Sequence, residues 1–209
     1  MLGNGPSLKN VLNKHKEFLK HKSLLAVNFF WQSEYYESIK PSYYLILSTN
    51  YWANNKIDIN EKGSKETFDN IAKKTDWPMV LLVPSEAKKH ERWKKELNKN
   101  KNIKIRYVNI TPIEGFKKYC HLLFKLKLGM PRIHNVLVGA VKISVDMGYK
   151  NIYLLGADHS WLKDIYVAPN NKVYLTQKHF YNEKEAKPEV MYQGESNKER
   201  TLAQMLMKF

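Results

Sequence analysis

The chain has 209 residues, of which 43% are hydrophobic and 26% are charged, a composition that indicates a folded globular protein rather than a disordered one. Lysine and arginine number 35 against 20 acidic residues, and the resulting formal net charge of +15 favours an anionic partner, either a nucleotide, a nucleic acid or an anionic membrane surface. The single cysteine, Cys120, excludes a disulfide framework and a cysteine-based zinc site.

Location and partners follow from the same features. The sequence shows no recognisable signal peptide and no apolar run long enough to span a bilayer, so we expect a cytoplasmic protein, with contact at the inner face of the membrane left open. The basic residues are scattered, and their densest run, residues 88–95, is typical of the solvated face of a helix. Nucleic acid is therefore not the favoured partner.

Short apolar runs predict the strands. Two apolar residues, Met1 and Leu2, resemble the end of a strand, and further strands are expected at residues 23–28, 43–48, 79–83, 103–108 and 152–155. Most of these runs are nearly continuous in apolar residues, which indicates strands that are covered on both faces and hence a mostly parallel sheet.

Helices are predicted between the strands. One follows Pro6, with Val11, Leu12, Phe18 and Leu19 at helical spacing, and another spans residues 64–74. A third helix is predicted for the basic run that follows Pro84. A capping pattern predicts a helix start at residues 111–114, and residues 135–147 are apolar almost all round, which predicts a buried helix. A final amphipathic helix is expected from residue 200.

Alternating strands and helices predict an α/β fold, a Rossmann-like and mostly parallel sheet with helices on both faces. We expect a single domain over residues 1–209, with an irregular, aromatic lid at residues 161–194 and with both termini truncated.

Small polar residues follow the predicted strands. In a doubly wound sheet, ligands bind at the carboxyl ends of the strands. The candidates for nucleotide binding there are Gly3, Asn4, Gly5, Ser7, Asn28, Thr49, Asn50, Gly156, Asp158 and Ser160. The glycines would let backbone amides approach a phosphate, and the helix after Pro6 would present its N-terminus to that anion. The alternative is that these residues serve only as turn and cap residues.

Histidines supply the candidate bases. His159 stands beside Asp158 at a strand end, and His179 lies in the predicted lid, where it would face an acceptor. Glu195 precedes the final helix and is either a first-turn carboxylate or a catalytic group. No spacing of histidines and carboxylates indicates a metal site.

Three segments resemble glycosyltransferase family 42, the bacterial sialyltransferases, and the related MptE-like proteins and motility accessory factors. Residues 2–9, Leu-Gly-Asn-Gly-Pro-Ser-Leu-Lys, resemble the opening motif, and residues 27–30 resemble the end of the second strand. Residues 131–133, followed by the apolar helix and residues 147–158, resemble the block from the donor-binding loop to a Gly-x-Asp strand end.

This resemblance implies a metal-independent, inverting glycosyltransferase with no permanently bound cofactor and a cytidine-monophosphate sugar as donor substrate. The acceptor would be a glycan or a lipid-linked sugar in surface-polysaccharide synthesis. It also implies that Asn135 belongs to the donor-binding loop and that Tyr166 and Tyr174 stabilise the leaving phosphate.

The sequence departs from the family pattern at three places, and at one of them the group His159-Ser160-Trp161 stands where the family has a tyrosine after Gly-x-Asp. His134, Asn135 and Val136 replace Thr-Ser-Gly after Arg132-Ile133. Glu195 stands where the family has its histidine base, so the base is expected to be Glu195 or His179, or to be missing.

Two other functions remain open at this stage. An MptE-like diphosphotransferase would move pyrophosphate from ATP to a pterin alcohol, and it would need Mg²⁺ and acidic ligands. A non-catalytic nucleotide-binding or nucleic-acid-binding module would account for the positive charge alone.

Overall fold

A computed structural model describes most of the chain. The residues described are 1–48, 51–52, 61–158, 163–176, 178–181, 187–190, 199 and 201–202. Among them, no helix is both long and apolar enough to cross a membrane.

The core of the fold is a parallel sheet of four strands. The strands β1 (Leu25–Val27), β2 (Tyr43–Leu45), β3 (Met79–Pro84) and β4 (Ile103–Val108) pair in the order β1-β2-β3-β4. Their registers align Leu25 with Tyr43, Tyr43 with Val80, and Val80 with Lys104. This confirms the predicted α/β class and the parallel sheet.

The first residues of the chain extend this sheet beyond β1. Leu2 forms parallel bridges with both Ala26 and Leu155. The Leu2 amide donates to the Leu25 carbonyl at 2.8 Å, and the Leu155 amide donates to the Met1 carbonyl at 3.0 Å. The predicted strand at residues 152–155 is thus reduced to one bridge, although it lies where a sixth strand would lie.

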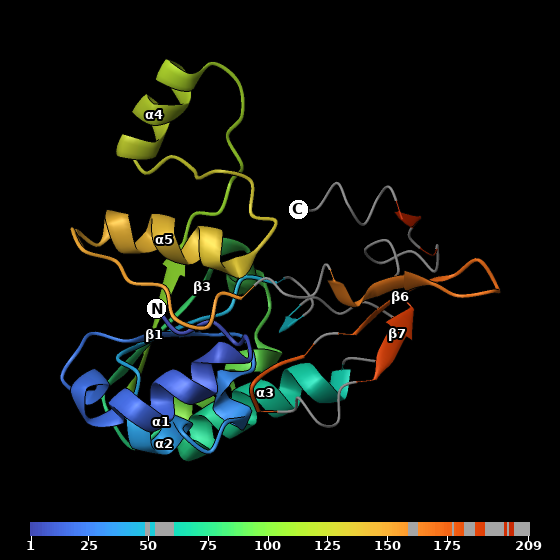
Figure 1. Cartoon of the computed structure of the whole chain (residues 1–209). Helices are drawn as coiled ribbons and strands as arrows, with labels where there is room; N and C mark the ends of the chain where they lie inside the picture. Colours follow the sequence, from blue (N-terminus) through green and yellow to red (C-terminus); the bar gives the residue numbers. More distant parts are fainter. Residues whose placement is uncertain are drawn as a thin grey trace.

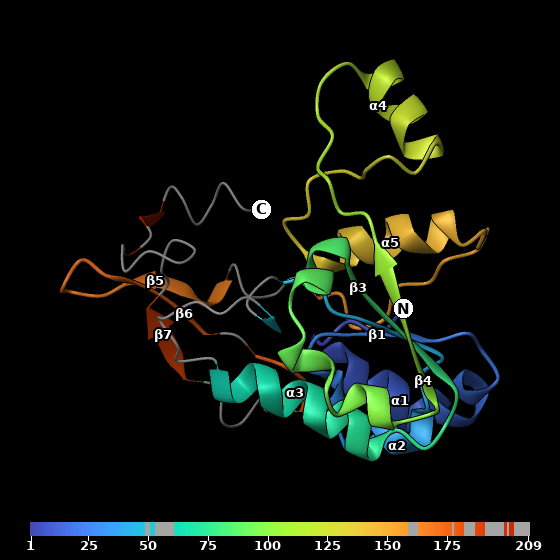
Figure 2. The ribbon, with the colours of Figure 1, turned by 180° about the vertical axis from the view of Figure 1, so that it is seen from behind.

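Helices cover the two faces of the sheet, as expected from the apolar strands. Figures 1 and 2 show α1 (Ser7–Lys20), α2 (Tyr36–Ile39) and α3 (Glu61–Lys74) on one face and α5 (Val136–Asp146) on the other. Successive strand residues point to opposite faces, so Ala26 and Tyr44 pack towards α1 and α2, whereas Leu25 and Leu45 pack towards α5.

Helix α1 buries Leu8, Leu12 and Leu19. Phe18, which belongs to the apolar pattern that predicted this helix, is 63% exposed, and the Lys22 ammonium lies 4.4 Å from its ring centroid. The helical register explains this result, because Leu8, Leu12 and Leu19 share a stripe from which Phe18 is rotated by about one residue.

The basic run after Pro84 does not form the predicted α-helix. It forms three 3₁₀ turns, η3 (Ser85–Lys89), η4 (Arg92–Lys94) and η5 (Leu97–Lys99). Trp93 is buried, and its indole Nε1 donates to the Ala87 carbonyl at 3.0 Å. Packing of this large side chain draws the chain into tight turns, while Lys88, Lys89 and Lys95 remain exposed.

The helix predicted to begin at Thr111 begins later, as α4 (Lys117–Lys125). Thr111 and Ile113 instead make backbone hydrogen bonds with Met130, at 2.9 and 3.0 Å, so the chain leaves and returns at the same point. Glu114, the predicted capping glutamate, forms a two-point ion pair with Arg132 at 2.7 Å. Tertiary pairing therefore overrides the local capping signal.

Helix α5 was predicted to be buried, but it is only partly buried, and Asn135 caps its N-terminus. The Asn135 side chain accepts a hydrogen bond from the Leu137 amide at 2.9 Å. Ala140 and Ile143 pack on the sheet, whereas Val138 and Val145 are exposed, because only one side of the helix contacts the sheet.

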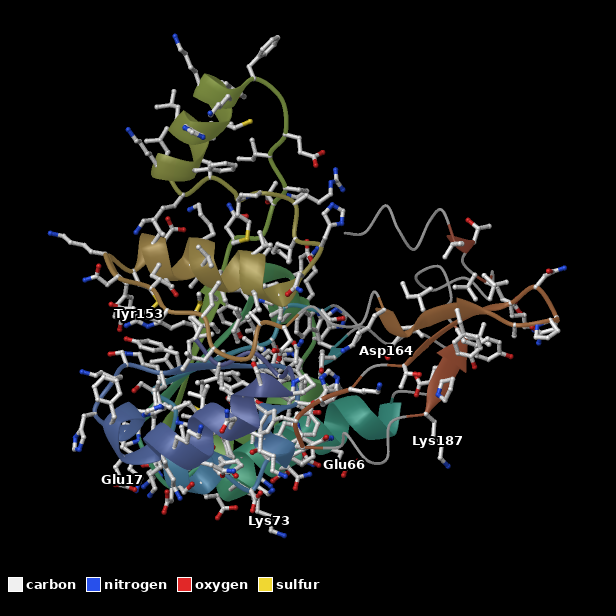
Figure 3. The ribbon with its side chains drawn as sticks, viewed as in Figure 1. Glu17, Glu66, Lys73, Tyr153, Asp164 and Lys187 are labelled. Atoms are coloured by element: carbon white, nitrogen blue, oxygen red, sulfur yellow. The ribbon has the colours of Figure 1, made fainter. Side chains whose placement is uncertain are left out.

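The segment predicted as an irregular lid contains a small antiparallel sheet. Its strands are β5 (Ile165–Val167), β6 (Val173–Thr176) and β7 (Pro188–Val190), in that order. Figure 1 shows this sheet projecting from the side of the parallel sheet, and Figure 3 labels Asp164 at the end of it that faces the main body. Between β6 and β7, residues 178–181 return to the main core.

Candidate functional site

The chain order of the strands creates a switch point at Leu2. From Leu2 the chain builds the sheet outward in one direction, through β1 to β4, and then returns to place Leu155 on the other side of Leu2. In open parallel sheets, the crevice between two strands whose connections leave in opposite directions is the usual ligand site. Here that crevice is bordered by residues 3–7 and 156–158.

Glycines allow these two loops to touch. A Cβ atom on Gly3 would lie 2.4 Å from the Gly156 carbonyl oxygen, and one on Gly5 would lie 2.1 Å from Asp158 Oδ2. Gly156 has a φ of +66°, which a side chain rarely tolerates, and its carbonyl accepts from the Gly5 amide at 2.9 Å. These glycines therefore serve the contact between two loops, whereas the sequence suggested contact with a ligand.

Asp158 caps helix α1. Its Oδ2 accepts a hydrogen bond from the Ser7 amide at 3.0 Å. The next two amides, of Leu8 and Lys9, donate to the carbonyls of Gly5 and Pro6. The Asp158 carboxylate thus occupies the helix N-terminus at which the sequence predicted a phosphate. The positive end of the helix dipole stabilises its negative charge, as it would stabilise a phosphate.

Two asparagines connect the first and second strand ends. Asn4 Nδ2 donates to the Val27 carbonyl at 3.1 Å. Asn28, which follows Val27 in the chain, has a left-handed φ of 49°, a conformation that asparagine tolerates better than most residues. The buried Tyr44 hydroxyl holds this turn, because it donates to the Asn28 carbonyl at 2.6 Å and accepts from the Trp31 amide at 2.9 Å.

Residues 178–181 bring the predicted base to this loop. The Phe180 amide donates to the Asn4 carbonyl at 3.1 Å, and the His179 imidazole also forms a hydrogen bond with the backbone of Asn4. Phe180 is buried, with its ring centroid 5.8 Å from that of Phe30 and 6.3 Å from that of Tyr35. The segment is therefore anchored in the main core by an aromatic side chain.

Burial sets the protonation of the residues around Asn4. It lowers the pKa of His179, although the hydrogen bond to Asn4 opposes this shift, so the imidazole is mainly neutral near pH 7. Burial also raises the pKa of Tyr181, whose ring stacks on that of His179 at 5.3 Å. A neutral imidazole beside a protonated phenol can accept one proton and donate another.

Two buried polar atoms at this place lack a partner among the described residues. They are Asn4 Oδ1 and the Tyr181 hydroxyl. A buried polar atom without a hydrogen bond costs about 1–3 kcal/mol, so such atoms are uncommon unless a ligand or solvent completes them. Both belong to residues that contact His179, Asn4 through its backbone and Tyr181 through its ring.

The structure brings together most of the predicted nucleotide-binding residues that it describes. Those that meet at the switch point, with the predicted base, are Gly3, Asn4, Gly5, Ser7, Asn28, Gly156, Asp158 and His179. Thr49, Asn50, His159, Ser160 and Glu195 lie outside the described residues.

Three predicted residues have other surroundings. Asn135 caps α5. Tyr166 and Tyr174 stack on each other across β5 and β6, with ring centroids 5.5 Å apart, on the sheet that projects from the main body. The tyrosine beside His179 is instead Tyr181. The sequence could have indicated that Tyr181 lies beside His179, because residues two positions apart share one side of an extended segment.

The described residues also line two surface cavities that lie away from the switch point. One of about 590 Å³ lies between α3 and η5, and one of about 570 Å³ lies between β4, α5 and the base of the α4 excursion. Within the same part of the chain, no group of three or more His, Cys, Asp or Glu side chains is arranged to hold a metal ion.

Comparisons with models of known protein families, with curated proteins and with solved structures gave no match for this chain. The site is therefore interpreted from its own geometry.

Proposed function

We propose that the protein is a glycosyltransferase that uses a nucleotide-activated sugar, of the cytidine-monophosphate type, in the synthesis of a surface glycan. The observation that carries the proposal is the position of His179, which lies against Asn4 at the switch point of a parallel sheet. The resemblance of residues 2–9, 27–30 and 147–158 to family 42 supports the same function and suggests the type of donor.

In the proposed site, the asparagine side chains bind the nucleotide. Asn4 Oδ1 is a buried acceptor that lacks a partner among the described residues, and it would receive a hydrogen bond from the donor substrate. Asn28 lies at the neighbouring strand end, linked to Asn4 through the Val27 carbonyl. The amides at the start of α1 already have internal partners, so side chains rather than these amides would make the specific contacts.

His179 would act as the general base. As the acceptor oxygen forms its bond to the anomeric carbon, its proton passes to the imidazole, while the bond between sugar and phosphate breaks and the electron pair leaves with the nucleotide. The lowered pKa of His179 suits this role, because a base must be unprotonated at the working pH. The neighbouring Tyr181 hydroxyl would donate a hydrogen bond to the leaving phosphate.

The first test separates binding from transfer. Cytidine monophosphate should raise the melting temperature more than uridine, adenine or guanine nucleotides do. His179→Ala should lower the rate of transfer from a cytidine-monophosphate sugar by about 100- to 10,000-fold while nucleotide affinity changes little. His21→Ala, an exposed histidine that follows the other end of α1, is the matched control and should retain full activity.

Three outcomes would contradict the proposal. The absence of any preference for cytidine would reject the donor class. Full activity of His179→Ala would reject the proposed base and direct attention to Glu195. Tight Mg²⁺-dependent binding of ATP, with none of the cytidine nucleotide, would favour the diphosphotransferase alternative.

A further inference from the structure

Helix α4 stands apart from the rest of the molecule. The chain leaves the sheet after β4, forms α4 at Lys117–Lys125 and returns at Met130, where it pairs with Thr111 and Ile113. Figures 1 and 2 both show α4 beyond α5, with no other element beside its outer side, and Figure 3 shows its side chains projecting from the molecule. This excursion, residues 114–129, has no part in the proposed nucleotide site.

The outer side of α4 carries an apolar stripe. Tyr119, Leu122 and Leu126 follow one another at intervals of three and four residues, which places them on one side of the helix, and they are 58%, 54% and 58% exposed. Phe116 and Leu128, at the two ends of the excursion, are exposed as well. Cys120, on the inner side, is buried.

Lysines border this stripe. Lys118 and Lys125 lie about a quarter of a turn from it, as the helical spacing requires. No ion pair is found for these two lysines among the described residues. An exposed apolar stripe beside cations that lack ion-pair partners matches an anionic surface with an apolar interior.

The excursion is held in place at its base. Lys142 of α5 donates to the Phe124 carbonyl at 3.3 Å, and the Lys127 ammonium donates to the Asp146 carbonyl at 3.0 Å. These contacts join the C-terminal end of the α4 excursion to α5.

We infer that the outer side of α4 binds the surface of an anionic lipid bilayer. Tyr119, Leu122 and Leu126 would enter the boundary between headgroups and acyl chains, and Lys118 and Lys125 would contact the lipid phosphates. A second copy of the chain fits this surface less well, because two such helices would bring like charges together on molecules of net charge +15. The inference does not depend on the proposed glycosyl transfer.

The test is sedimentation of the full chain with vesicles. The protein should bind vesicles that contain equal parts of phosphatidylcholine and phosphatidylglycerol, and it should bind pure phosphatidylcholine at least tenfold more weakly. The combined change Tyr119→Ser, Leu122→Ser and Leu126→Ser should weaken binding by about tenfold or more, because the apolar contact is lost. The pair Lys118→Glu and Lys125→Glu should weaken it by about as much.

Matched controls lie on the opposite side of the molecule. Phe18→Ser removes an equally exposed apolar side chain from α1, and Lys73→Glu reverses a charge on α3, where Figure 3 shows Lys73 pointing outward. Both should bind vesicles like the unchanged protein. Since all these side chains are exposed, circular dichroism should show an unchanged fold.

Several results would overturn the inference. These are no binding to the anionic vesicles, equal binding to neutral and anionic vesicles, and equal loss of binding in the control variants. A dimer in solution that the triple serine variant dissociates would assign the stripe to a second copy of the chain instead.

Discussion

At the scale of single residues, His179 links stability and chemistry. Its pKa lies below the ordinary value of 6.5 because the imidazole is largely removed from water in the folded protein. The unfolded chain therefore takes up the proton at a higher pH than the folded chain does. The same shift that keeps the proposed base neutral makes the fold sensitive to acid.

This shift predicts a pH dependence of the free energy of unfolding. As the pH falls through the ordinary pKa of 6.5, the unfolded state is protonated first, so stability decreases, and the decrease ends below the folded pKa. The slope should not exceed about 1.4 kcal/mol per pH unit for this one group. Urea denaturation at several pH values measures it, and His179→Gln should flatten the curve. Identical curves for both proteins would contradict the assigned burial.

At the scale of elements, one tyrosine of β2 positions the turn that ends β1. The Tyr44 hydroxyl is buried and bonds both to the Asn28 carbonyl and to the Trp31 amide. Burial and the neighbouring tyrosines raise the pKa of Tyr44, so its hydroxyl remains a donor at every ordinary pH. A side chain of the neighbouring strand thus stabilises the left-handed backbone conformation of Asn28.

Removal of that hydroxyl should be costly. Tyr44→Phe leaves the buried Trp31 amide without its acceptor, which predicts a loss of about 1–3 kcal/mol in the free energy of unfolding. Tyr43→Phe is the matched control, because this neighbour faces the other side of the sheet, is less buried, and makes only a 3.5 Å contact with the Tyr149 hydroxyl. Chemical denaturation of both variants gives the comparison, and equal losses would argue against the role assigned to Tyr44.

At the scale of the whole molecule, the described part of the segment after residue 161 is anchored in the core through residues 178–181. Phe180 is 4% exposed and packs with Phe30 and Tyr35, whereas the small sheet itself has a minor core of Val173 and Leu175. The position of His179 therefore depends on the anchoring of the residue that follows it.

Phe180→Ala tests this anchoring. The loss of a buried aromatic ring predicts a decrease of about 3 kcal/mol in the free energy of unfolding, and the displaced His179 should lower glycosyl transfer as well. Tyr166→Ala, which removes an exposed ring from β5, should cost less than about 1 kcal/mol. Urea denaturation distinguishes the two variants, and a small effect of Phe180→Ala would show that other contacts hold the segment.

Periodicity along the chain was a good guide to the sheet and a poor one to local helix starts. Nearly continuous apolar runs predicted β1 to β3, because strands covered on both faces have apolar residues at almost every position. A weaker, alternating run predicted β4, and a long apolar stretch predicted α5. The capping pattern at Thr111 and the basic run after Pro84 were misleading, since pairing with Met130 and burial of Trp93 outweighed local propensity. Alternation in the segment after residue 161 was too weak to reveal β5 to β7.

The sequence by itself therefore determined the class of fold and the set of strand ends at which polar residues collect. The tertiary structure decided which of these residues meet. Asp158 and Ser7 are 151 residues apart, and His179 reaches Asn4 only because Phe180 enters the core. Such contacts depend on strand order and on long-range packing, and neither leaves a periodic signal in the chain.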